Sequence, residues 1–157
     1  IRLARNDTPI ITSIDTPFQV GKAQIVFIPE SGLAQVGIIA TGPILYKAII
    51  VARLLEKKGV KVKVMNLSTI KPLDNEAIIA LARETKAIVT AEDHQIAGGM
   101  GSAVAELLSL NYAVPIEFVG VDNKFGQSGN PEELEKHYGI DVDHILEKVN
   151  KILKRKI

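Results

Sequence analysis

The stretch that most constrains the fold is Ile88–Leu110, which reads IVTAEDHQIAGGMGSAVAELLSL. The β-branched apolar run Ala87–Ala91 at its start is typical of a buried parallel strand. The polar cluster Glu92-Asp93-His94 and a glycine turn over residues 98–101 follow, and the stretch ends in apolar residues at helical spacing. This order predicts one β–α unit of an open α/β sheet, in which backbone N–H groups gather at the helix N-terminus.

The rest of the chain repeats this alternation of short apolar runs and amphipathic segments. Further strands are predicted at Ile25–Ile28, Val36–Ala40, Val60–Leu67 and Pro115–Val121. Helices are predicted after Gly42-Pro43, Asp74 and Gly101, at Pro131–Gly139, and after Asp141. Strands that alternate with helices pair in parallel through right-handed crossovers. We therefore expect an α/β fold: an open, mostly parallel, doubly wound sheet of about five strands with helices on both faces. The first strand, bounded by Pro29, is a candidate antiparallel edge.

Residues 1–21 differ from the remainder because they are polar and irregular, with Pro9 and Pro17 and one strand-like patch at Ile10–Ile14. They predict a linker from an upstream domain, and residues 22–157 predict the folded domain. Ile1 is not a natural start, so we expect the chain to be a piece of a longer protein.

Composition excludes several function classes. Apolar residues make up 46% and charged residues 24% of the chain, as in ordinary globular domains. The net charge is +1 without a basic stripe, which argues against a nucleic-acid binder. The absence of cysteine excludes disulfides and thiolate sites. The most apolar region, Val36–Leu55, is interrupted by Gly42-Pro43 and Lys47, so we expect no membrane span and a cytoplasmic protein.

The glycine turn has two interpretations. Gly99 and Gly101 supply a G-x-G, but Val104 stands where a dinucleotide fingerprint has its third glycine. The glycines either let the helix pack closely on its strand or form a loop that binds an anion across Gly98–Ser102. A loop at Phe125–Gly129 has the same two interpretations, turn or anion site.

The cluster Glu92-Asp93-His94 carries the most polar chemistry in the chain. Adjacent residues of an extended chain point to opposite sides, so these three side chains are not expected to converge on a metal. We interpret them as a polar rim at the carboxyl end of the sheet, with His94 hydrogen-bonded or facing a partner. No Ser/His/Asp arrangement or phosphate-binding Walker loop is evident.

Four stretches in register resemble the C-terminal domain of transketolases, in the short form found as split subunits. They are IATG at Ile39–Gly42, STIKPLD at Ser68–Asp74, VTAEDHQIAGGMGSAVAELL at Val89–Leu108, and VDNKFGQSGNPEELEKHYGI at Val121–Ile140. Deoxyxylulose-phosphate synthases and the β subunits of 2-oxo acid dehydrogenases share the pattern more loosely. The AEDH and KFGQSG motifs favour transketolase over both. The resemblance implies a Rossmann-like fold, as in the C-terminal domain of transketolases.

The resemblance implies transfer of a two-carbon ketol unit between sugar phosphates, as in the pentose phosphate pathway, with thiamine diphosphate and Mg²⁺ as cofactors. The family's GDG motif is absent here, and its cofactor-activating glutamate should lie upstream of Ile1. The resemblance therefore implies that this piece holds no catalytic residue and no cofactor, and is inactive alone. Its implied role is contact with the upstream transketolase domains or subunit and assembly of a homodimer.

One residue of this piece is expected to touch substrate. Leu3-Ala4-Arg5-Asn6 matches the family's linker, in which an arginine binds the sugar phosphate, so the resemblance assigns that role to Arg5. Arg2 is the competing candidate. The candidate interface or anion loop comprises Glu92, Asp93, His94, Gly98, Gly99, Gly101 and Ser102. The competing function class is a stand-alone module that binds a nucleotide or a regulatory anion at this loop.

Overall fold

The computed structural model describes residues 1, 3–4 and 7–156, and within them the chain alternates strands and helices. The strands are β1 (Gln24–Phe27), β2 (Val36–Thr41), β3 (Val62–Asn66), β4 (Ile88–Gln95) and β5 (Ile116–Val121). The helices are α1 (Ile44–Glu56), α2 (Asn75–Thr85), α3 (Met100–Asn111), α4 (Pro131–Tyr138) and α5 (Val142–Arg155).

The strands form one sheet in the order β1-β3-β2-β4-β5. The edge strand β1 runs antiparallel to β3, and every other neighbouring pair is parallel. The predicted open, mostly parallel, doubly wound sheet with an antiparallel edge is therefore confirmed. The chain leaves β2 toward β3 and returns past β2 to β4, so the direction of winding changes between β2 and β4. In such sheets, ligand crevices lie at this switch point, outside the carboxyl ends of the strands.

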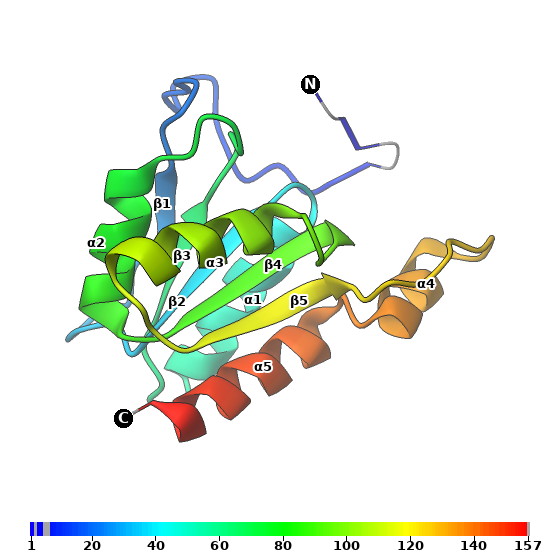
Figure 1. The fold of residues 1–157 in the computed structure, drawn as a ribbon. Coiled ribbons are helices and arrows are strands. Elements are labelled where there is room, and N and C mark those ends of the chain that lie inside the picture. Colours follow the sequence, from blue (N-terminus) through cyan, green and yellow to red (C-terminus); the bar gives the residue numbers. More distant parts are fainter. Residues whose placement is uncertain (2, 5–6, 157) are drawn as a thin grey trace.

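Helices cover both faces of the sheet (Figure 1). Side chains of α1 and α5 pack with one face, and those of α2 and α3 with the other. The central strand β2 shows the division, because Ile38 belongs to the first core and Ile39 to the second, and both are fully buried. The sheet therefore separates two apolar layers.

The helix ends follow the predicted capping residues. The Asp74 carboxylate accepts from Ala77 N at 3.3 Å, and the Asp141 carboxylate accepts from His144 N at 2.9 Å. Gly139 ends α4 with a φ of 70°, a conformation that favours glycine. α4 contributes no buried residue, and with its preceding loop it projects beyond the carboxyl ends of β4 and β5 (Figure 1).

The strand-like patch Ile10–Ile14 forms no strand, and its isoleucine side chains are exposed. One local expectation was wrong. The polar cluster after Ala91 is not a loop, because β4 continues through it to Gln95. Pairing with β5 is irregular there: Ala91 lies opposite Val119 and Gln95 opposite Val121.

Gly120 of β5 faces this irregular stretch. A Cβ on Gly120 would lie 2.9 Å from the His94 carbonyl oxygen, so the glycine leaves the space into which β4 bends. The bend lets residues 92–95 stay in the sheet while their side chains take separate directions.

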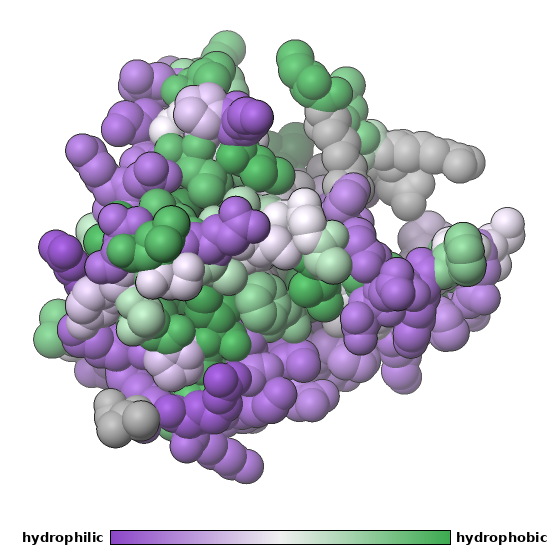
Figure 2. Space-filling model, in the orientation of Figure 1, coloured by the Kyte–Doolittle hydropathy of each residue, from purple (hydrophilic) through white to green (hydrophobic). Residues whose placement is uncertain are grey.

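The surface differs between elements. Figure 2 shows mainly hydrophilic residues over the region of α4 and α5, with apolar residues on the face where α3 lies. None of the helices in the described ranges is long and apolar enough to cross a membrane.

Candidate functional site

The sequence candidates meet at one corner of the sheet, where β4 ends and α3 begins. We call residues 92–102 the α3 corner. The Glu92 side chain points inward there and is 2% exposed. Its two carboxylate oxygens accept from the backbone N–H groups of Met100 and Gly101, each at 2.8 Å. Glu92 thus pairs two of the N–H groups that have no partner within a helix.

Glycines make room for this carboxylate. A Cβ on Gly99 would lie 2.4 Å from Glu92 Oε2, and one on Gly101 would lie 2.6 Å from Thr90 Oγ1 and 2.8 Å from Phe118 Cδ1. The φ angle of Gly101 is not positive, since Gly101 lies in the first turn of α3. The glycine is therefore required by close packing rather than by its backbone conformation.

The other members of the predicted loop point away from Glu92. The Asp93 carboxylate lies near Gly42, where a Cβ would be 3.2 Å from its Oδ1, whereas His94 is exposed. Ser102 Oγ accepts from Gly98 N at 3.0 Å and donates to the Ile96 carbonyl at 2.7 Å, which closes the turn before α3. The three polar side chains of residues 92–94 therefore do not converge.

The α3 corner does not fit an external diphosphate or metal. Its first two helix amides already bind Glu92, and a second anion beside that buried carboxylate would be repelled. Across the described part of the chain, no group of three His, Cys, Asp or Glu residues lies close enough together to hold a metal ion. We therefore derive no cofactor chemistry from this corner.

A hollow of about 1140 Å³ lies beside the carboxyl ends of β2 and β4, at the switch point of the sheet. Its walls come from the N-terminal segment (Ala4, Asp7, Thr8), the start of α1 (Pro43, Ile44, Lys47), Asp93, and the α4 region (residues 127–132, 134, 135 and 140). The hollow lies at the position where a doubly wound sheet is expected to bind a ligand or partner. The candidate Arg5 and its competitor Arg2 fall outside the described residues.

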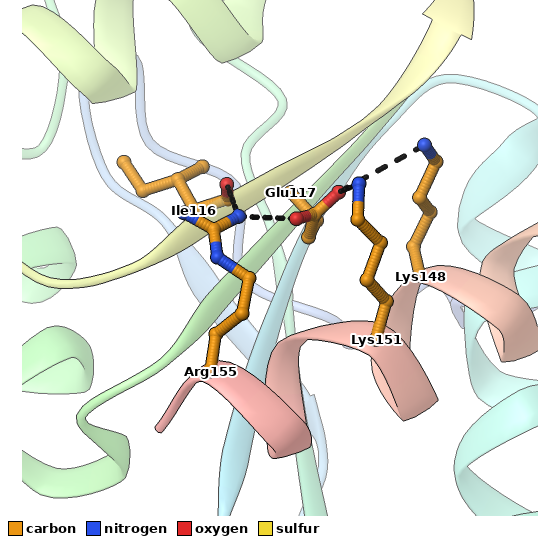
Figure 3. A network of polar contacts seen from close by, with 5 residues as sticks. All are labelled: Ile116, Glu117, Lys148, Lys151 and Arg155. Carbon is orange, nitrogen blue, oxygen red and sulfur yellow. Dashed lines mark hydrogen bonds and ion pairs between the residues drawn. The ribbon is translucent and has the colours of Figure 1, made fainter. Parts of the chain in front are cut away.

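A second polar cluster lies on the edge strand β5 and was missed by the sequence reasoning (Figure 3). The Glu117 carboxylate is 5% exposed and accepts from Lys151 Nζ at 2.9 Å and from Arg155. Lys148 Nζ lies 3.8 Å away. Burial raises the pKa of Glu117, but the hydrogen bonds from Lys151 and Arg155 and the charges of Lys151 and Lys148 together lower it below its usual value. The cluster fastens α5 to the sheet edge.

Comparison with known proteins identifies the family. The family described as transketolase, C-terminal domain, matches residues 28–145. This chain belongs to that family. The four stretches that suggested transketolase each include the carboxyl end of a strand or the loop that follows a strand, so they come together on the same side of the sheet.

Individual relatives agree with this assignment. A 6-deoxy-6-sulfo-D-fructose transketolase subunit from Clostridium sp. strain MSTE9 is 37% identical over 99% of this chain and 47% of the relative. Human transketolase is 38% identical over 98% of this chain and 24% of the relative. A solved structure described as a split gene transketolase, inactive beta4 tetramer, has a TM-score of 0.90 and 37% identity, over 98% of this chain and 49% of that one. This transketolase C-terminal domain thus spans about half the length of the first and third relatives, and about a quarter of the second.

Proposed function

We propose that this domain works as the C-terminal part of a cytoplasmic transketolase, which transfers a two-carbon ketol unit between sugar phosphates. The observation that carries the proposal is the likeness to a split gene transketolase, with a TM-score of 0.90 over 98% of the chain. The matched region of residues 28–145 contains the AEDH and KFGQSG stretches, which supports transketolase over more distant relatives.

Within that enzyme, the chemistry belongs to parts that precede this domain. Thiamine diphosphate and Mg²⁺ would supply the carbanion chemistry there when bound. The occupied amides of the α3 corner support the view that the cofactor binds elsewhere. We infer that this chain alone binds no thiamine diphosphate and transfers no ketol unit.

The role that we propose for the domain is assembly. Residues 1–21 act as the linker from the upstream domain, which in transketolases binds the pyrimidine ring of the cofactor, and residues 22–157 act as the folded support. Two copies associate in the active enzyme, because symmetric dimers are the commonest assembly. Arg5, in the linker, binds the phosphate group of the sugar through its planar guanidinium.

The proposal is tested by three measurements on the wild-type protein. Titration calorimetry of the isolated chain with thiamine diphosphate and Mg²⁺ should give no heat of binding, and micromolar affinity would contradict the proposal. The complete enzyme, which contains this domain and the preceding transketolase sequence, should transfer a ketol unit between sugar phosphates. Activity with pyruvate and glyceraldehyde 3-phosphate, or with 2-oxo acids, would instead assign the domain to one of the related enzymes. A melting-temperature rise of the isolated chain with nucleotides would favour a stand-alone binding module.

A further inference from the structure

The hollow at the switch point has an acidic lining. The carboxylates of Asp7, Asp93, Glu132 and Glu135 contribute to its walls, and Lys47 is the one cationic side chain among its described lining residues. Lys47 is already paired, since its Nζ lies 2.6 Å from Glu135 Oε1. Asp7, in the N-terminal segment, and Glu132, in α4, both line the hollow and are exposed to solvent. The electrostatic field of these two exposed carboxylates favours a positively charged occupant.

One side of the hollow is formed by α4, which is held in place by polar contacts with Lys47 of α1. Besides its ion pair with Glu135, Lys47 Nζ donates to the Ile140 carbonyl at 3.1 Å, just beyond the end of α4. An ammonium group at this end also interacts favourably with the helix dipole. Because α4 buries no side chain of its own, its faces away from Lys47 remain available for contact.

The loop before α4 is tied to that helix through its backbone and exposes an apolar side chain. The Tyr138 hydroxyl donates to the Phe125 carbonyl at 2.8 Å, which ties the loop to α4. The Phe125 side chain is nevertheless fully exposed. An exposed aromatic group on a tethered loop beside an acidic hollow is an arrangement that suits protein contact, because aromatic residues are enriched at interfaces.

The opposite side of the hollow indicates the occupant. Ala4, Asp7 and Thr8 form this side, so the hollow lies next to the N-terminal segment of the domain. In the split gene transketolase and the Clostridium subunit, the region matched by this chain is about half of the whole protein. A C-terminal domain is preceded by the rest of such a protein, so the preceding portion would approach the domain beside this hollow.

We propose that the hollow is a docking site for the preceding portion of the transketolase, which contacts it with basic side chains and covers Phe125. Lys47 acts as a positioning residue that holds α4 in place for this contact. The inference rests on the proposed function, because it takes its partner from the transketolase assignment. It goes further by locating the contact and stating the charge of the partner surface.

The test compares the same substitutions in two contexts, this chain alone and the complete enzyme. Glu132→Lys and Glu133→Lys form a matched pair, since both residues are exposed in the first turn of α4 but only Glu132 lines the hollow. Both should shift the Tm of the isolated chain equally. In the complete enzyme, Glu132→Lys should lower the Tm by roughly 2–4 °C more than Glu133→Lys does, and 1 M salt should reduce the difference.

A second pair tests the apolar contact. Phe125→Ser and Leu110→Ser each remove an exposed apolar side chain, and Leu110 lies on α3, outside the hollow. Neither substitution should change the Tm of the isolated chain appreciably. In the complete enzyme, Phe125→Ser should lower the Tm, whereas Leu110→Ser should not. If both pairs behave alike in both contexts, the hollow is not the docking site. That result is separable from failure of the proposed function, which would appear as wild-type enzyme without ketol transfer.

Discussion

Glu92 offers the sharpest test of how this domain is stabilised. Its carboxylate is 2% exposed and bonds two backbone amides at the start of α3. Glu92→Ala removes the only anion at this helix end among the residues that the structure describes, and leaves both amides buried without a partner. The substitution therefore tests whether the α3 corner depends on an internal carboxylate.

The expected cost follows from these two bonds. A hydrogen bond to a charged group contributes about 1.5–3 kcal/mol, so the pair contributes roughly 3–6 kcal/mol. For a domain of this size, each kcal/mol corresponds to about 2–4 °C, so the Tm of Glu92→Ala should fall by about 6–24 °C.

Urea and thermal unfolding measure this difference, with Asp141→Ala as the control. Asp141 caps α5 from a more exposed position, so its loss should cost only about 1 kcal/mol. Formate should restore part of the stability of Glu92→Ala, because it supplies a carboxylate of suitable size. With a Kd on the order of 10 mM, 100 mM formate would restore about 1.4 kcal/mol.

Two results would refute this reasoning. A loss as small as that of Asp141→Ala would mean that water satisfies the α3 amides in place of Glu92. Equal recovery in formate and in sodium chloride of the same ionic strength would mean that general screening, rather than anion binding at the α3 corner, explains the rescue.

Four further outcomes are expected. Burial raises the pKa of Glu117, but its contacts with Lys151 and Arg155 lower that pKa by more than burial raises it. The contribution of Glu117 to stability is therefore present above the usual carboxyl pKa of 4.5 and is lost as the pH falls through the lowered pKa. The difference in urea stability between wild type and Glu117→Gln should therefore narrow between about pH 6 and pH 3, and a constant difference would contradict the network. Gly101→Val should lower the Tm more than Gly98→Ala, because a Cβ on Gly101 meets Thr90 and Phe118 within 2.8 Å, whereas one on Gly98 meets nothing within 4 Å; equal shifts would disprove the packing account. In the complete enzyme, Arg5→Ala should raise the KM for sugar phosphates about ten- to a hundredfold with a smaller effect on kcat. An unchanged KM, with a raised KM in Arg2→Ala, would move the phosphate contact to Arg2. Sedimentation of the wild-type chain at tens of micromolar, a rough range for weak interfaces, should show self-association, and a monomer alone would count against a dimer role for the isolated domain.

The fold was predictable because its signals are local and repeated. Continuous apolar runs such as Val36–Ala40 indicate strands buried on both faces, and Asp74 and Asp141 mark helix starts. The alternation of these elements then leaves few topologies, since parallel strands need crossovers of one hand. The antiparallel edge was also signalled locally, because Pro29 follows a short first strand.

The α3 corner was harder to predict because it depends on contacts between distant segments. Residues 92–95 look like a polar loop, yet they remain in β4 since Gly120 of the neighbouring strand leaves space for the bend. Glu117 pairs with Lys151 and Arg155, which lie more than thirty positions away, and no spacing rule predicts such a pairing from the sequence. Gly120, the residue before the last one of β5, was the one available signal of the bend.

The Glu92 contact also constrains where ligands and partners can bind. In a doubly wound sheet, a helix N-terminus beside a glycine turn is the usual place for a phosphate, but here the chain places its own carboxylate on those amides. The hollow at the switch point has four carboxylates and one lysine among its described lining residues. These carboxylates favour a basic protein surface as the occupant, whereas the sugar phosphate is assigned to Arg5, which lies outside the described residues. If the complete enzyme with Glu92→Ala keeps wild-type ketol transfer at temperatures below its lowered Tm, the α3 corner serves stability alone. A loss of ketol transfer in the folded variant would show that the corner also acts in the reaction.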